Sequence, residues 1–202
     1  MSVTHLFFDI GGVLGTNGWS SEQRRQAIDR FELDAAEFEQ QHRDAVGTFE
    51  QGRMTLDEYL DATVFYRHRE FSRQGFVDFM LAESRPDEAT VSLARQLAAT
   101  GRYRMMTLNN ESLELNLHRI ERFGLRDMFE AFFTSCWIGV TKPSRQIYEV
   151  ALGISQAPPA RAVFIDDRGP NLMPAQALGM RTIHFTTGDE LAGQLAALGV
   201  GA

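Results

Sequence analysis

The sequence of 202 residues contains little cysteine and no long hydrophobic run. Its one cysteine, Cys136, cannot form an internal disulfide, so the chain carries no sign of an oxidising compartment. Cys136 lies in an apolar run without a neighbouring base, which favours a small core residue over a nucleophile. No apolar run approaches membrane-spanning length and the N-terminus lacks a signal-peptide pattern, so we expect a cytoplasmic protein without a membrane partner.

The charge balance is only mildly acidic, with a formal net charge of −7. A hydrophobic fraction of 44% and a charged fraction of 23% are those of an ordinary globular protein. The negative balance argues against nucleic acid as a partner. It does not exclude an anionic substrate, because one metal ion and one lysine can reverse the local field. The sequence leaves the oligomeric state open.

The chain changes character near residue 86. Residues 20–81 carry helix-capping signals and almost no strand pattern, whereas strand and helix alternate afterwards. This shift indicates an inserted all-helical module. We predict an α/β core of residues 1–15 and 86–202, with residues 16–85 forming a small helical cap after the first strand.

The alternation predicts a Rossmann-like parallel sheet with helices on both faces. The expected strands are 4–8, 103–108, 131–135, 161–165 and 180–185, and the expected core helices are 87–99, 113–123, 145–152, 172–178 and 190–198, with Gly153 and Gly179 as two of the helix stops. Ligands of such sheets bind beyond the carboxyl ends of the strands.

Polar side chains follow the predicted strands at these ends. Asp9 and two glycines follow the first strand, and the later tips carry Asn109-Asn110, Lys142 and Asp166-Asp167. Each has an ordinary structural reading: an Asp-capped turn, helix capping, a surface lysine or an N-cap. Together they form the parts of a metal-assisted phosphoryl transfer site, in which Asp9 attacks phosphorus.

These motifs resemble those of the haloacid dehalogenase superfamily across the whole core. FDIGGVL at residues 8–14 matches the first motif, and LNN at 108–110 falls on the second. Lys142-Pro143 followed by IY at 147–148 falls on the third. FIDD at 164–167, with NL at 171–172, PA at 174–175 and LGM at 178–180, is similar to the fourth motif of the phosphatase domain in bifunctional epoxide hydrolases.

The resemblance implies a phosphatase for a small-molecule phosphate ester, with a sugar phosphate as one example and Mg²⁺ as cofactor. It places Asp9 and Lys142 as catalytic residues. It places Asp9, the Gly11 carbonyl, Asp167 and, through water, Asp166 around the metal. Substrate contacts would come from four residues after the first and second core strands: Gly11, Gly12, Asn109 and Asn110.

Two positions depart from the family pattern. Gly11 stands where family phosphatases usually carry a second Asp as general acid and base, and Leu108 stands where a Ser or Thr usually precedes the Asn. Losing a general acid costs about two to four orders of magnitude in rate. We therefore expect a weakened or selective phosphatase that favours leaving groups needing little protonation, such as anomeric sugar phosphates or acyl phosphates.

Two other functions stay open. A haloacid dehalogenase would attack carbon with Asp9 and needs no general acid, but it has no need of the Asp166-Asp167 pair. A non-catalytic protein would only bind a phosphate ligand or a partner. Cap residues that could contact a substrate, each more typical of a solvated helix face, are His42, Arg43, Arg53, Tyr66, Arg67, His68 and Arg69.

Overall fold

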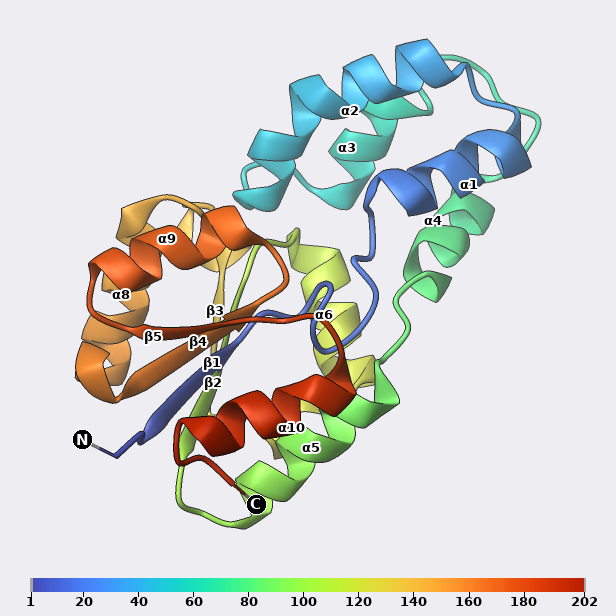
Figure 1. The fold of residues 1–202 in the computed structure, drawn as a ribbon. Coiled ribbons are helices and arrows are strands. Elements are labelled where there is room, and N and C mark those ends of the chain that lie inside the picture. Colours follow the sequence, from blue (N-terminus) through green and yellow to red (C-terminus); the bar gives the residue numbers. More distant parts are fainter. Residues whose placement is uncertain (1, 202) are drawn as a thin grey trace.

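The computed structural model describes residues 2–201, which form a five-stranded parallel sheet flanked by helices (Figure 1). The strand order is β3-β2-β1-β4-β5, so β1 is central and its two neighbours come from distant parts of the chain. This confirms the predicted Rossmann-like α/β fold. The strands are β1 His5–Phe8, β2 Arg104–Asn109, β3 Ala131–Thr134, β4 Ala162–Asp166 and β5 Arg181–His184.

Helices cover both faces of the sheet, as the two-residue alternation of buried side chains requires. Leu6 and Phe8 of β1 pack with α5, α6 and α10, whereas Phe7 packs on the other face with α8 and α9. The core helices are α5 Glu88–Ala99, α6 Leu113–Arg122, α7 Ser135–Ile138, α8 Arg145–Ser155, α9 Gly169–Ala177 and α10 Gly188–Ala197, with short 3₁₀ turns η1 Leu125–Asp127 and η2 Pro159–Arg161.

The segment between β1 and α5 folds into helices that lie beyond the sheet (Figure 1). They are α1 Ser21–Phe31, α2 Ala35–Glu50, α3 Leu56–Thr63 and α4 Arg73–Ala82. The side chains of Ser20, Asp34 and Thr55 accept hydrogen bonds from the first turns of α1, α2 and α3, and Thr55 forms a capping box with Glu58.

This helical module has a hydrophobic cluster of its own, built around Trp19, Phe38, Tyr59 and Phe76, which α6 joins through Leu115. The two chain segments that connect it to the core run side by side. The Thr16 N–H donates to the Arg85 carbonyl over 2.9 Å, and Gly15 pairs with Pro86. The separate cluster and the paired connection support the predicted division near residues 15 and 86, which stays a prediction.

Three local predictions differ from the structure. Gly153 does not stop α8: it costs about 1 kcal/mol in a helix without breaking it, and α8 ends at Ser155, where Gln156 takes a left-handed conformation with φ 55°. Helix α9 begins at Gly169, three residues before the predicted start, because Pro170 fits a first helical turn. The single-turn helix α7 after β3 was not predicted.

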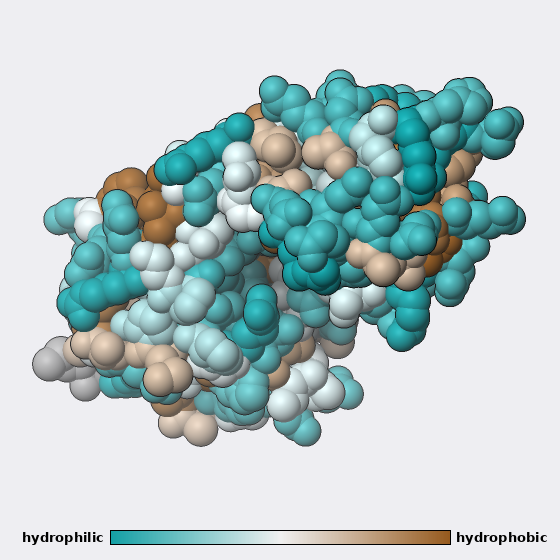
Figure 2. Space-filling view, turned by 90° about the horizontal axis from the view of Figure 1, so that it is seen from above, coloured by the Kyte–Doolittle hydropathy of each residue, from teal (hydrophilic) through white to brown (hydrophobic). Residues whose placement is uncertain are grey.

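The face of the molecule seen in Figure 2 is mostly hydrophilic, and its apolar residues form scattered patches. Among residues 2–201, no helix combines the length and hydrophobicity needed to cross a bilayer.

Candidate functional site

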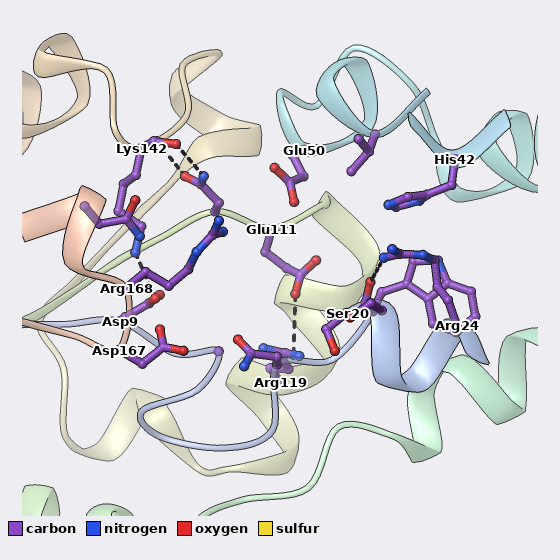
Figure 3. A pocket seen from close by; sticks show the side chains of 17 residues that line it. Asp9, Ser20, Arg24, His42, Glu50, Glu111, Arg119, Lys142, Asp167 and Arg168 are labelled. Carbon is purple, nitrogen blue, oxygen red and sulfur yellow. Dashed lines mark hydrogen bonds and ion pairs between the residues drawn. The ribbon is translucent and has the colours of Figure 1, made fainter. Parts of the chain in front are cut away.

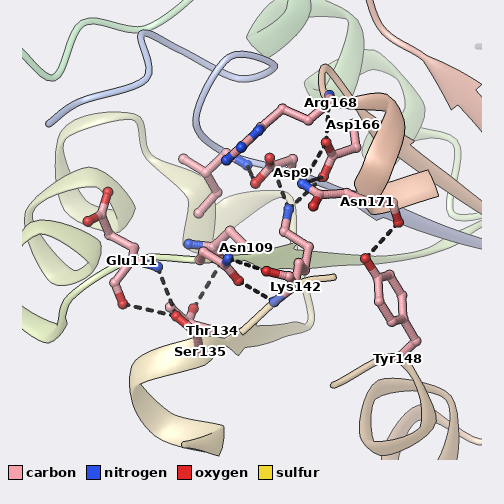
Figure 4. A network of polar contacts seen from close by, with 12 residues as sticks. Asp9, Asn109, Glu111, Thr134, Ser135, Lys142, Tyr148, Asp166, Arg168 and Asn171 are labelled. Carbon is pink, nitrogen blue, oxygen red and sulfur yellow. Dashed lines mark hydrogen bonds and ion pairs between the residues drawn. The ribbon is translucent and has the colours of Figure 1, made fainter. Parts of the chain in front are cut away.

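The acidic strand tips meet because β1 and β4 are neighbours in register. Phe8 is aligned with Ile165, and the Asp9 N–H donates to the Ile165 carbonyl over 2.9 Å. Asp9 therefore lies opposite Asp166, with Asp167 next to it. Each of the three carboxylates offers an oxygen within 4.8 Å of the other two. Residues more than 150 positions apart thus converge on one point (Figure 4).

Lys142 bridges two of these carboxylates. Its Nζ lies 2.9 Å from Asp9 Oδ2 and 2.6 Å from Asp166 Oδ2, and its side chain is 1% exposed, so it is no surface lysine. It is the only lysine in the chain, where the other 19 basic residues are arginines. A compact ammonium fits between two carboxylates more closely than a planar guanidinium. That the chain keeps a lysine at this position alone is a second sequence signal for its role, beside the family motif that contains it.

The titration of this group follows from burial and pairing. Burial raises the pKa of Asp9 to about 7, although Lys142 pulls it down. Burial by itself would lower the pKa of Lys142, but the Asp9 and Asp166 carboxylates outweigh it and hold that pKa above its usual range. Burial, reinforced by Asp166, also raises the pKa of Asp167. The shifted pKa values of these buried groups are typical of a functional site and differ from those of ordinary surface acids.

The carboxylate cluster fits a hard divalent cation. Asp167 Oδ1 is buried and has no hydrogen-bond partner among the described residues. Three carboxylates and one ammonium leave two negative charges, which one divalent cation balances. Gly12 makes the arrangement possible: its φ is 78°, and a Cβ there would overlap the Asp167 carboxylate. Gly12 therefore makes room for a carboxylate, and it does not itself line the cavity.

The two asparagines after β2 have different environments. Asn110 clamps the Lys142 loop: its Nδ2 donates to the Lys142 carbonyl over 2.9 Å, and its Oδ1 accepts from the Lys142 N–H over 2.7 Å. Asn110 also lines the cavity. Asn109 points elsewhere, donating to Asn116 over 3.2 Å and accepting from Thr134 over 3.0 Å (Figure 4). Its amide joins β2, β3 and α6, and Asn109 does not line the cavity.

A cavity of about 580 Å³ lies between the strand tips and the helical module (Figure 3). Its core wall includes Asp9, Gly11, Lys142 and Asp167, while Asp166 lies buried behind Lys142. Of the predicted cap contacts only His42 lines it. The sequence analysis missed other lining residues, namely Asn17, Trp19, Ser20, Ser21, Arg24, Val46, Glu50, Glu111, Arg119, Arg168 and Asn171.

His42 faces the cavity as a neutral ring. The Trp19 Nε1–H donates to the Tyr59 hydroxyl over 2.8 Å, and the same hydroxyl forms a hydrogen bond with His42 Nδ1, also at 2.8 Å. Burial, reinforced by Arg24, lowers the pKa of His42 to about 4. The ring is therefore uncharged near neutral pH.

Glu50 brings an acidic group from the end of α2 to the cavity (Figure 3). Its carbonyl accepts from the Ser135 hydroxyl over 2.6 Å, which ties the helical module to the core. Burial, with Glu111 nearby, raises the pKa of Glu50 to about 7. Cys136, by contrast, is only half-buried, yet burial raises its thiol pKa to about 12, so it is no nucleophile.

The chain belongs to the haloacid dehalogenase-like hydrolases, whose family model matches residues 3–179. Over 203 aligned residues it is 28% identical to bifunctional epoxide hydrolase 2 of Sus scrofa, covering 91% of this chain and 36% of that protein. It is 33% identical over 102 residues to sesquiterpene phosphatase astK of Aspergillus oryzae, covering 50% and 52%. The chain thus spans about a third to a half of these relatives.

Solved structures share the fold. A haloacid dehalogenase family enzyme of Bacteroides thetaiotaomicron, in complex with magnesium and inorganic phosphate, has a TM-score of 0.74 at 20% identity, covering 93% of this chain and 96% of that one. The L-2-haloacid dehalogenase of Xanthobacter autotrophicus has a TM-score of 0.63 at 18% identity, covering 96% and 83%. The fold alone therefore does not choose between attack on phosphorus and attack on carbon.

Proposed function

We propose that this protein is a Mg²⁺-dependent phosphatase that transfers the phosphoryl group of a small-molecule phosphate ester to Asp9 and then to water. The observation that carries the proposal is the convergence of three carboxylates and one buried lysine at the wall of a cavity. A cavity of about 580 Å³ suits a small molecule. The phosphatase among the relatives and the magnesium and phosphate bound by the Bacteroides enzyme support the same reading.

Asp9 is held ready to attack. Its Oδ1 accepts from the Ile10 N–H over 2.8 Å and its Oδ2 lies 2.9 Å from Lys142 Nζ, so both oxygens are oriented. One of them would displace the leaving group from phosphorus and form an aspartyl-phosphate. Lys142 would then stabilise charge on the transferred phosphoryl oxygens. Asp166 holds Lys142 in place from behind.

The carboxylates of Asp9 and Asp167 and the Gly11 carbonyl are the groups we assign to Mg²⁺, with Asp166 acting through water. A bound ion would supply positive charge that stabilises the phosphoryl group as it is transferred. The unpartnered Oδ1 of Asp167 is an oxygen available to such an ion.

Weakened catalysis with poor leaving groups follows from the two departures from the family pattern. Gly11 lies in the cavity wall but has no acid to offer, and Leu108 is fully buried in the core, where it cannot donate to a phosphate. Leaving groups that depart without a proton are therefore the favoured substrates.

The dehalogenase alternative shares Asp9 as nucleophile and is favoured only by the missing acid at Gly11. Attack on carbon does not require the carboxylates of Asp166 and Asp167. Because like charges repel, placing these two carboxylates side by side is unfavourable unless they have a function. A pure binding protein gives no reason to orient Asp9 through both oxygens.

A panel of phosphate esters assayed with MgCl₂ or with EDTA tests the proposal. We expect Mg²⁺-dependent phosphate release by the wild type and none by Asp9→Asn, while Asp29→Asn, at an exposed acid of α1, keeps wild-type rates. Chloride release from 2-chloropropionate in EDTA would favour the dehalogenase. A folded protein that turns over neither class would support the binding protein instead.

A further inference from the structure

The wall of the cavity contains a guanidinium with a buried donor nitrogen that has no partner among the residues that the structure describes. Arg119 of α6 is 1% exposed and faces the same cavity as Asp9 (Figure 3). Its Nε lies 3.3 Å from Ser84 Oγ and 3.5 Å from Glu111 Oε2, both long contacts, and its buried Nη2 has no hydrogen-bond partner among residues 2–201. A buried cation with unmet donors is costly unless an anion completes it.

The loop after β1 is shaped around this guanidinium. A Cβ on Gly11 would lie 3.3 Å from Arg119 Nη1, and a Cβ on Gly18, where φ is 70°, would overlap Nη2. Gly11 is two residues from Asp9. The guanidinium therefore stands next to the backbone of the nucleophile loop, close to where a group attached to the transferred phosphoryl would lie.

The other buried or half-buried cations of the cavity are already engaged. Lys142 is shared by Asp9 and Asp166. Arg24 is paired with Glu39 at 2.9 Å and donates to a backbone carbonyl. Arg119 is thus the buried cation of this wall that retains capacity for a further anion.

We infer that Arg119 binds an anionic leaving group, so that the substrates of this site are phosphoric anhydrides, with a diphosphate monoester as the class that fits. The inference rests on the proposed phosphatase function and names its substrate class. An arginine stays protonated and cannot act as a general acid, but it holds a developing negative charge. A leaving phosphate monoester needs no proton, because its second pKa is about 6.

The chemistry balances without a further co-reactant. An Asp9 oxygen forms a bond to the terminal phosphorus, the bond from that phosphorus to the bridging oxygen breaks, and the electron pair stays on the bridging oxygen. The leaving group departs as a phosphate monoester dianion against Arg119. Water then attacks the aspartyl-phosphate, giving inorganic phosphate and free Asp9, and the proton of the water passes to solvent.

Steady-state kinetics at fixed free Mg²⁺ with two substrates test the inference. The first is methyl diphosphate, whose leaving group is methyl phosphate. The second is an aryl phosphate whose phenol has the same pKa as methyl phosphate, so that the two leaving groups are equally acidic. We expect the wild type to prefer methyl diphosphate in kcat/KM. Arg119→Met should reduce that kcat/KM about 10- to 100-fold, the range of a hydrogen bond to a charged group. It should reduce the kcat/KM of the aryl ester by a clearly smaller factor, because that leaving group brings no second phosphate to Arg119. Arg119→Lys should fall between.

Arg122→Met is the matched control. Arg122 lies one turn further along α6, is exposed, and donates to the Ser84 carbonyl over 3.0 Å without lining the cavity. It should keep the wild-type preference. If Arg119→Met does not fold, an inhibition experiment on the wild type takes its place. The inhibition constant of methylene diphosphonate against aryl ester turnover should be at least about tenfold lower than that of methylphosphonate.

Equal loss of both substrates in Arg119→Met, or equal inhibition by the two phosphonates, would overturn the inference and assign Arg119 a structural role. In either case Asp9-dependent turnover of the aryl ester would leave the proposed phosphatase standing. An absence of turnover with every phosphate compound would overturn both.

Discussion

Lys142→Met removes the buried cation while keeping the length of the side chain. At an effective dielectric of about 20, each of the contacts at 2.9 and 2.6 Å contributes roughly 6 kcal/mol of attraction. Desolvation of the buried ions offsets most of this gain. Breaking such a pair from one side still costs about 3–5 kcal/mol, because Asp9 and Asp166 remain buried without their partner. We therefore expect a loss of about 4 kcal/mol in EDTA, or roughly 10 °C in Tm.

The loss should depend on pH and on Mg²⁺. Burial raises the pKa of Asp9 and Lys142 lowers it, so without Lys142 the folded state holds the Asp9 proton still more tightly than the unfolded state does. Stability then falls as pH rises through the acidic to neutral range, and the deficit is larger at pH 8 than at pH 5.5. Mg²⁺ should raise the Tm of the variant more than that of the wild type, since the variant has one more negative charge to balance.

Chemical denaturation and differential scanning calorimetry at both pH values, with MgCl₂ or EDTA, measure these quantities. Arg145→Met is the control, because its 2.7 Å pair with Glu149 is exposed on α8 and contributes less than about 1 kcal/mol. A deficit in Lys142→Met that stays constant across pH and Mg²⁺ would refute the charge argument and leave only packing.

Three further variants test other parts of the site. Asp167→Asn should abolish most of the Tm rise that Mg²⁺ gives the wild type, about 2.7 kcal/mol at 100 times Kd, in a thermal-shift titration; an unchanged rise would remove Asp167 from the metal site. Gly12→Ala should lose more than about 1 kcal/mol in urea unfolding and weaken Mg²⁺ binding, because its Cβ would overlap the Asp167 carboxylate at a φ of 78°. Burial lowers the pKa of His42 to about 4 in the folded state. The neutral ring therefore stabilises the fold at pH values above the unfolded-state pKa, and this contribution is lost as pH falls towards 4. The wild type's advantage over His42→Gln should thus shrink by up to about 3 kcal/mol between pH 7 and pH 4; a constant difference would contradict a neutral His42.

The sequence predicts the sheet and the converging acids because both depend on local rules. Short apolar runs that end in polar tips define parallel strands, and neighbouring strands must bring Asp9 and Asp166 to one edge. Gly153 shows the limit of such rules, since packing carries α8 past a residue that would favour a stop. The predicted stop at Gly153 was therefore wrong, because tertiary contacts outweigh the low helix propensity of one glycine.

The cavity wall could not be predicted in the same way. Which face of a cap helix meets the core depends on packing between segments far apart in sequence, so nothing in the sequence singles out Glu50 among the acids of the cap. Arg119, which the sequence analysis did not single out, is 1% exposed and lines the cavity. Asn109 and Asn110 are adjacent and chemically identical, yet only Asn110 reaches the cavity, because successive residues at a strand end point to opposite sides.

The charges of the site explain why a single lysine would not suffice for phosphoryl transfer. The carboxylates that would bind a metal ion also repel a phosphate dianion, and Lys142 is shared by two of them. A divalent ion would neutralise the remaining negative charge of the carboxylates, but it would leave no further positive charge for a substrate that carries a second phosphate. Arg119 lies in the same wall, with no carboxylate close enough to satisfy it fully. Under the proposed function this leaves Arg119 with a donor that is unpaired among the described residues, beside the nucleophile loop, and an anionic leaving group is the substrate feature that would pair with it.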